Sequence, residues 1–316
     1  MMRYLLILML FWCAPVWAED FESWREGVKL EAAAQGIGPS AIAALDAVEP
    51  NPRVIELDRK QPEHAITFAE YSRNLLSDLR IRRGRELVLL HAGALNAAAA
   101  SYGVPSKYLV ALWGMESSYG SVSGNFGILQ SLATLAYEGR RAAFFRGELI
   151  AALKIIDLDG IAPDAMRGSW AGAMGQCQFM PSTFLRFAVD GDGDGRRDIW
   201  NNLPDIFSSM GNYMRAEGWQ PGMGWGMRVV ALHVMASQLV GLKQAQPLTV
   251  WQKLGLRAAD GHDLPADQLS MYYLVQPDGP AGPSYLVTPN YKIIMRWNRS
   301  TYFATTVGLL ADLIEP

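Results

Sequence analysis

The chain has 316 residues, half of them hydrophobic, and a formal net charge of −3 at pH 7. This length suits one large domain or two coupled ones, because a domain usually holds roughly 100–200 residues. This small charge excludes the strongly basic surface of a nucleic-acid-binding protein, and it is also too small for a disordered acidic chain.

The N-terminal segment, residues 1–18, has the character of a secretory signal. Arg3 supplies the positive charge, an apolar run follows, and the segment ends in the sequence VWA. The apolar run is shorter than the ~20 residues that a membrane span requires. We therefore expect export with cleavage after about Ala18 and no transmembrane segment thereafter; the alternative is an uncleaved membrane anchor. Cleavage would leave Cys177 as the only cysteine, so no intrachain disulfide is expected.

Four further segments follow in chain order. Residues 19–100 predict a helical N-terminal domain, because apolar residues recur there at helical spacing. Residues 101–225 predict a second helical block, which Gly-rich turns interrupt. In residues 226–288 the runs MYYLV and SYLV flank QPDGPAG, which predicts a hairpin in a small β-containing insertion. Residues 289–316 return to helix, so the predicted fold class is mainly α (α+β).

A glutamate ends the most apolar of these helices. Pro105 suits a first turn and Gly120 lies beyond a plausible end, which predicts a helix over residues 106–117. Every residue from 108 to 115 is apolar or glycine, so the helix has no solvated face. Burial and the negative end of the helix dipole should both raise the pKa of Glu116, as a general acid near neutral pH requires. The alternative is a structural glutamate paired with Arg140, Arg141 or Arg146.

Other catalytic motifs are missing from the sequence. The four histidines (His64, His91, His233 and His262) form no HExxH pair, and no Gly-x-Ser-x-Gly motif is present. The sequence also contains no P-loop and no dinucleotide-binding fingerprint. Metal-hydrolase and serine-hydrolase functions therefore have no support, and an acid without a nucleophilic partner remains.

Six motifs carry a resemblance to a known family. In chain order they are WGMESSYG, SLATLAYEGRRAAFFRGEL, GSWAGAMGQCQFMPSTF, VDGDGDGRRDIW, GNYMRAEGW and RWNRSTYF. Together they resemble the lytic murein transglycosylases of the membrane-bound B type, from about residue 21 to the C-terminus. Ser117 departs from the pattern, since members often carry threonine there. The resemblance implies a lysozyme-like helical core, a helical N-terminal domain and a small β domain around a long cleft.

The resemblance also implies a reaction that needs one carboxyl group. Glu116 matches the family's catalytic acid, which cuts the β-1,4 bond between N-acetylmuramic acid and N-acetylglucosamine. It would protonate the leaving oxygen while the substrate's N-acetyl group stabilises the cation at the anomeric carbon. The resulting carboxylate would deprotonate the C6 hydroxyl of the same muramic acid, which closes to a 1,6-anhydro sugar. No cofactor is implied for catalysis.

Several positions match substrate-binding residues of the family. Trp297 and Phe303 stand where tyrosines are expected, which keeps aromatic stacking but loses hydroxyl groups. The alternative for each matched residue is packing in the core. The matched positions are Ser169, Gln178, Tyr213, Asn298, Tyr71 and Trp297.

An aspartate-rich loop has the spacing of an EF-hand calcium loop. The sequence DGDGDG begins at Asp190 and places a glycine at the sixth position, where the turn requires one. Asn201 occupies the twelfth position in place of the expected acid, so the loop would have to be longer than standard. We expect a weak structural Ca²⁺ site here; the alternative is a polar turn. The candidate ligands are Asp190, Asp192, Asp194, the backbone carbonyl of Arg196, Asp198 and Asp205.

The expected partners are peptidoglycan glycan strands in the periplasm, together with proteins of cell-wall synthesis or turnover, and no nucleic acid. Two other functions stay open. A hydrolytic muramidase would need a second carboxylate about 6.5–9.5 Å from Glu116, or about 5–5.5 Å if it retains configuration. A non-catalytic peptidoglycan-binding protein would keep the cleft but would not need the acid.

Overall fold

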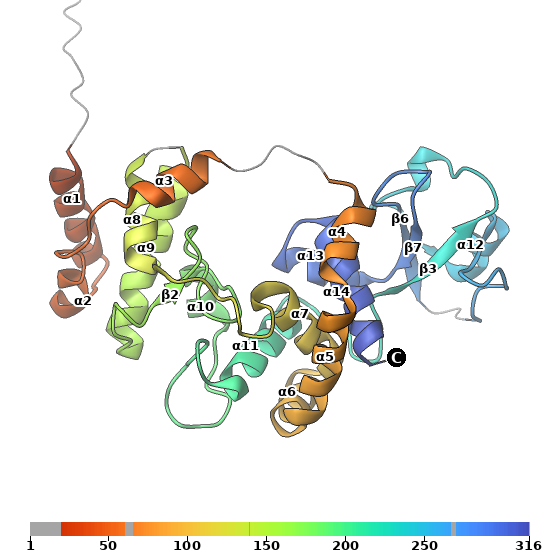
Figure 1. The fold of residues 1–316 in the computed structure, drawn as a ribbon, viewed down its shortest axis with the longest axis horizontal. Helices are drawn as coiled ribbons and strands as arrows, with labels where there is room; N and C mark the ends of the chain where they lie inside the picture. Colours follow the sequence, from red (N-terminus) through yellow and green to blue (C-terminus); the bar gives the residue numbers. More distant parts are fainter. Residues whose placement is uncertain (1–19, 61–65, 139, 267–269, 316) are drawn as a thin grey trace, which may run out of the picture.

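The computed structural model describes residues 20–60, 66–138, 140–266 and 270–315 (Figure 1). The predicted signal at residues 1–18, with its cleavage site, lies outside the described residues. The described chain is mainly α-helical with a small five-stranded sheet and a two-stranded ribbon, which confirms the predicted fold class. None of the described helices combines the length and the apolar character that crossing a bilayer would demand.

The N-terminal helices pack in two groups. Local caps start several of them: the Asp20 side chain accepts from the Ser23 N–H, and Thr67 and Glu70 form a capping box. The first three helices lie against α8 (Ile128–Glu138) and α9 (Ala142–Asp159). The next three lie against α7 (Ser106–Ser117), α11 (Leu203–Ala216) and α14 (Thr301–Ile314) (Figure 1). The six helices are α1 (Phe21–Ala34), α2 (Pro39–Ala43), α3 (Pro52–Arg59), α4 (Phe68–Leu75), α5 (Asp78–Leu90) and α6 (Ala92–Tyr102).

The central segment contains five helices and a two-stranded ribbon. Its elements are α7 (Ser106–Ser117), β1 (Phe126–Gly127), α8 (Ile128–Glu138), α9 (Ala142–Asp159), β2 (Arg167–Gly168), α10 (Pro181–Phe187) and α11 (Leu203–Ala216). The ribbon is antiparallel, with Phe126 opposite Gly168. Glu148 on α9 is buried and accepts from the backbone N–H of Ser182, 2.9 Å away, which fixes the start of α10.

The sheet occupies the end of the molecule opposite α1 (Figure 1). It is antiparallel with strand order β4-β6-β7-β3-β5, and β6 and β7 form the hairpin that the sequence predicted. A small hydrophobic cluster around Trp251 and Leu274 lies on the sheet. The elements are β3 (Gly226–Ala231), the 3-10 helix η1 (Ser237–Leu239), β4 (Gln246–Pro247), α12 (Leu248–Lys253), β5 (Leu256–Ala258), β6 (Met271–Val275) and β7 (Ser284–Val287).

The last two helices return to the centre of the molecule. They are α13 (Pro289–Trp297) and α14 (Thr301–Ile314), and α14 packs along α7. Helix α7 also contacts α5, α6 and α11, and its residues from Tyr108 to Gly114 are buried. The prediction of a helix without a solvated face is therefore confirmed. Helix α7 lies near the middle of the molecule, beside α5 and α11 (Figure 1).

Candidate active site

The C-terminus of α7 is an unusual helix end. Ser118 and Tyr119 both have positive φ angles, 49° and 59°, although neither is glycine, and Gly120 follows with φ of 80°. L-residues rarely adopt this left-handed conformation. The helix thus ends at Ser117, as predicted, but two non-glycine residues begin the turn that was expected at Gly120. Glu116 lies in the last turn of α7, two residues before Ser118.

Helix α5 holds this turn in place. The Arg80 guanidinium donates to the carbonyl of Gly114 and to Ser118 Oγ, the latter 3.3 Å away. In return the Tyr119 hydroxyl donates to the Arg80 carbonyl at 3.0 Å. A Cβ at position 114 would lie 2.6 Å from the Tyr119 ring, so only glycine lets the ring fold back onto the helix. These contacts support the unusual conformation around Glu116.

Burial controls the charge of Glu116. The residue keeps some exposed surface, but the atoms packed around its carboxyl group exclude most of the water that would stabilise a negative charge. This desolvation raises the pKa of Glu116 to about 7, and a hydrogen bond from the Trp297 side chain opposes the increase. The predicted increase in pKa is confirmed. A pKa near neutrality lets the group act as a proton donor and, once ionised, as a proton acceptor.

The three arginines proposed as structural partners of Glu116 lie elsewhere. Arg140 pairs with Asp58 at 2.7 Å, and Arg146 pairs with Glu31 at 2.5 Å. Arg141 lies over the Phe145 ring, 4.7 Å from its centroid. The alternative of an ion pair with one of these arginines is therefore wrong. Within the described ranges, Glu116 has no ion-pair partner.

Segments distant in sequence meet around Glu116. Trp297, the last residue of α13, hydrogen-bonds to its carboxyl group. Tyr71 on α4 is close enough for the Glu116 charge to add to the burial that raises the tyrosine's pKa. Cys177, from the loop before α10, is fully buried, and burial followed by the Glu116 charge raises the thiol pKa well above its usual value.

An aromatic cluster extends from Trp297. Its ring lies 4.7 Å from that of Tyr213 on α11 and 5.2 Å from that of Phe179. Burial raises the pKa of Tyr213 to about 12, so its hydroxyl stays protonated at neutral pH. Asn298 is the C-cap of α13 and its side chain is exposed beside this cluster.

Ser169 and Gln178 lie on the glycine-rich loop between β2 and α10. Ser169 Oγ accepts from the Ala173 N–H at 3.0 Å. The Gln178 amide donates to the carbonyls of Ser123 and Gly175, at 2.8 and 2.7 Å, and thereby ties this loop to the turn after α7. Gly168 packs so closely that a Cβ would lie 1.9 Å from the Ala173 carbonyl oxygen. The backbone at position 168 therefore requires glycine for this close approach.

Two residues that support Glu116 were not predicted. Gln176 accepts from the Trp113 indole at 2.7 Å and donates to the Trp200 carbonyl at 2.6 Å, which links α7 to the loop before α11. Arg80, described above, is the other. No local sequence motif indicates the partners of either residue, because the contacts span 24 to 63 residues of sequence. Only an alignment with covarying positions could have revealed them.

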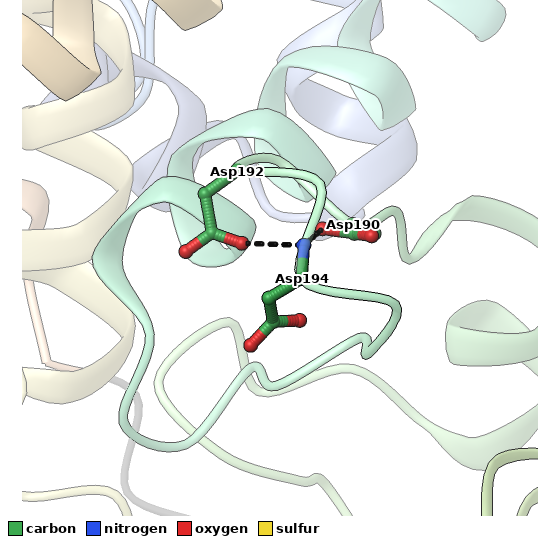
Figure 2. Close-up of side chains that lie close together, drawn as sticks. All are labelled: Asp190, Asp192 and Asp194. Carbon is green, nitrogen blue, oxygen red and sulfur yellow. Dashed lines mark hydrogen bonds between the residues drawn. The ribbon is translucent and has the colours of Figure 1, made fainter.

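The aspartate-rich loop brings three of its predicted ligands together. Carboxylate oxygens of Asp190, Asp192 and Asp194 lie within 4.8 Å of one another, and Figure 2 shows the Asp194 N–H facing both of the other side chains. Oxygen donors of this kind suit Ca²⁺. The carboxylates of Asp198 and Asp205 accept instead from backbone N–H groups, those of Trp200 and Gly191 among them. Arg196 is exposed on the same loop.

Comparisons with known proteins agree with this architecture. The family model described as "Transglycosylase SLT domain" matches residues 20–312. The chain is 32% identical over 249 residues to membrane-bound lytic murein transglycosylase B of Escherichia coli K12, a match that covers 78% of this chain and 67% of the relative.

Two solved structures show the same fold. SltB3 from Pseudomonas aeruginosa, in complex with NAG-anhNAM-pentapeptide, superposes with a TM-score of 0.91 at 42% identity, over 94% of this chain and 80% of that one. The Escherichia coli lytic transglycosylase Slt35, in complex with calcium, superposes with a TM-score of 0.79 at 28% identity, over 92% of each chain.

Proposed function

Because the chain belongs to the SLT transglycosylase family and is a lytic transglycosylase of peptidoglycan, we propose that Glu116 is its single catalytic carboxyl group. We further propose that the reaction leaves 1,6-anhydromuramoyl ends. The observation that carries this proposal is the position of Glu116. It lies in the last turn of a buried helix, has a pKa of about 7, and has no cationic partner among the described residues.

A pKa near 7 suits both halves of the reaction. The protonated Glu116 can donate to the glycosidic oxygen as the bond to the anomeric carbon breaks. The carboxylate formed can then accept the proton of the C6 hydroxyl while that oxygen attacks the same carbon. An intramolecular nucleophile gains from effective molarity and needs no activated water. The reaction therefore requires one carboxyl group that can donate and accept a proton, and a site from which water is largely excluded.

The charges around Glu116 support a mechanism with one acid. No other carboxylate of the described chain contributes to the shift in its pKa, which burial dominates. An inverting or retaining hydrolase would place a second carboxylate about 5–9.5 Å away, where its charge would raise the pKa further. In a mechanism with one acid, the substrate's N-acetyl group stabilises the cation at the anomeric carbon, and its C6 hydroxyl is the nucleophile.

We propose supporting roles for the residues around this acid. Trp297 orients the carboxyl group through its indole N–H and, with Tyr213, offers aromatic faces to sugar rings. Tyr71 forms part of the wall beside Glu116. Ser169, Gln178 and Asn298 offer hydroxyl and amide groups that can hydrogen-bond to the glycan.

We also propose export to the periplasm and a structural Ca²⁺ ion on Asp190, Asp192 and Asp194. Peptidoglycan lies outside the cytoplasmic membrane, and residues 1–18 have the character of a signal. The calcium complex of the relative Slt35 supports the metal proposal. No catalytic role for the ion is proposed.

Mass spectrometry of digested sacculi tests the reaction. We expect muropeptides one water lighter than hydrolysis products, since the C6 hydroxyl and not water attacks the anomeric carbon. Reducing products of the heavier mass would identify a hydrolase with a second carboxylate. Intact sacculi after prolonged incubation would identify a non-catalytic binding protein. Either result would overturn the proposal.

A further inference from the structure

A groove beside the aromatic cluster is strongly cationic. It has a volume of about 610 Å³ and lies between α10, α11 and α13. Four cationic side chains and one carboxylate line it, in a chain whose formal net charge is −3. We call it the cationic groove, and its charged residues are Arg186, Lys292, Arg296, Arg299 and Glu217.

The one carboxylate leaves much of this charge unneutralised. Glu217 pairs with Arg296 at 2.9 Å and with Arg186 at 3.5 Å. Lys292 lies over the Tyr273 ring, 3.7 Å from its centroid, which positions the ammonium group but leaves its charge. Arg299 is exposed and forms no ion pair or hydrogen bond within the described segments. Two cations therefore remain available to an anionic ligand.

The cationic groove adjoins the catalytic residues through an aromatic wall. Tyr213 lines the groove, and its ring lies 4.7 Å from that of Trp297, which hydrogen-bonds to Glu116. Glu116 itself does not line the groove. A ligand group held there would lie beside the reacting sugar without blocking the acid.

We propose that the cationic groove binds carboxylates of the peptide stem, and that the enzyme thereby prefers peptide-bearing glycan to naked glycan. This inference rests on the proposed function, because it identifies which form of peptidoglycan the same site takes. The sugar rings carry neutral hydroxyl and acetamido groups, and the lactyl group of muramic acid is neutral while it is amide-linked to the peptide, whereas a pentapeptide carries an ionised C-terminus. The relative SltB3 has been solved with NAG-NAM-pentapeptide, so a ligand with such a peptide fits this fold. Guanidinium and ammonium groups bind carboxylates through charge-assisted hydrogen bonds.

Three forms of one substrate test the proposal. The first is peptide-bearing glycan, and the second has its peptide carboxylates converted to methylamides. The third has its peptides removed by an amidase, which leaves one lactyl carboxylate beside each muramic acid ring. The wild type should have the lowest KM for the first form, by roughly threefold to tenfold, as expected for one or two partly exposed ion pairs. Added salt should reduce this difference, because it screens exposed charges.

Variants link the preference to the groove. Arg299→Glu and Lys292→Gln should each raise KM for the carboxylate form and leave KM for the methylamide form nearly unchanged. Arg82→Glu is the matched control, because Arg82 is exposed on α5 and lies outside the groove. Equal losses on all three substrates would show that the groove binds sugar, and no change on any substrate would show that it binds nothing. Both results overturn the proposal.

A failure of the proposed function can be distinguished from a failure of the groove. If the wild type turns over none of the substrates, the proposed reaction is wrong, and calorimetric titration with NAG-NAM-pentapeptide then tests the groove directly. We expect Arg299→Glu to weaken that binding roughly threefold or more and Arg82→Glu to leave it unchanged. Identical affinities for the two variants and the wild type would contradict the inference.

Discussion

At the scale of single residues, the burial of Glu116 affects both its acid chemistry and the stability of the folded protein. Burial raises its pKa from 4.5 to about 7, so the unfolded chain releases this proton at a lower pH than the folded protein does. The native state therefore binds more protons between pH 4.5 and 7, and its stability falls as pH rises through that window. A site that keeps an acid protonated near neutrality thus destabilises the fold at alkaline pH.

Replacement of Glu116 tests both consequences. Glu116→Gln should reduce kcat at least about 100-fold, since the acid is lost. The same variant should be more stable than the wild type at pH 8, by at most roughly 3 kcal/mol and less where solvent reaches the carboxylate, and nearly equal to it at pH 4. Denaturant unfolding at the two pH values measures this. Stability lower than wild type at pH 8 would show that the charge has a stabilising partner.

The pH profile of the wild type provides an independent measure. The kcat/KM should fall about tenfold per pH unit above about 7, as the acid form of Glu116 disappears. Trp297→Phe keeps an aromatic ring but removes the hydrogen bond that lowers this pKa, so the alkaline limb should move to higher pH. An alkaline limb at the same pH in the variant and the wild type would show that Trp297 does not influence the carboxyl group.

At the scale of elements, the end of α7 is held by other helices and not by its own sequence. Two successive non-glycine residues with positive φ cost roughly 1–3 kcal/mol each, and the contacts with Arg80 on α5 offset that cost. Gln176 adds a second link from the opposite loop. The acid is therefore positioned by a junction of three elements.

Removal of Arg80 should loosen this junction. Arg80→Ala leaves the Gly114 carbonyl and the Ser118 hydroxyl without their donor, which should cost about 1.5–3 kcal/mol of stability. We expect kcat to fall about tenfold or more while KM changes little, because a small displacement of the acid affects the chemical step. Arg82→Ala, on the exposed side of the same helix, is the control. Equal kinetics for both variants would contradict a positioning role.

The aspartate-rich loop is the element in which we propose a Ca²⁺ site. Three backbone N–H groups donate to Asp190 and lower its pKa, so it stays ionised at neutral pH. We expect millimolar Ca²⁺ to raise Tm in proportion to the logarithm of its concentration, and Mg²⁺ to do so less, because the loop offers a flexible oxygen site. Asp192→Asn should abolish the shift, whereas Asp164→Asn, an exposed aspartate elsewhere, should not. A Tm that is independent of Ca²⁺ would rule out the site.

At the scale of the whole molecule, one hydrophobic core joins the two ends of the described chain. It runs from Trp24 on α1 to Ile314 on α14, and only the sheet adds a separate small cluster. Asp278, between β6 and β7, connects the sheet to the core. Its carboxylate accepts from the backbone N–H groups of Phe68 and Ala69 at the start of α4, and from the Tyr302 hydroxyl on α14.

This connection predicts an effect at a distance. Asp278→Ala should lower Tm and raise KM, because α4 also carries Tyr71 beside Glu116. The hydrogen bonds from the backbone lower the pKa of Asp278, so this stabilisation is present above the usual carboxyl pKa and is lost as pH falls through the lowered value. The difference in Tm between variant and wild type should therefore shrink in strong acid. A difference independent of pH would show that the carboxylate charge plays no part.

The sequence alone determined the mainly α fold class, the helix that carries Glu116, its bounds, and the hairpin of the sheet. These features depend on apolar spacing, turn residues and motifs within short stretches of chain, which is where single-sequence patterns are informative. The increase in the pKa of Glu116 also followed from local composition, because a helix with no polar face must be buried.

The tertiary structure alone decided which side chains surround the acid. Arg140, Arg141 and Arg146 were plausible partners by composition, yet each pairs or stacks elsewhere, and Arg80 and Gln176 support α7 instead. The cationic groove likewise draws on α10, α11 and α13. Such contacts join residues far apart in the chain, and their choice depends on how whole helices pack, which no local pattern encodes.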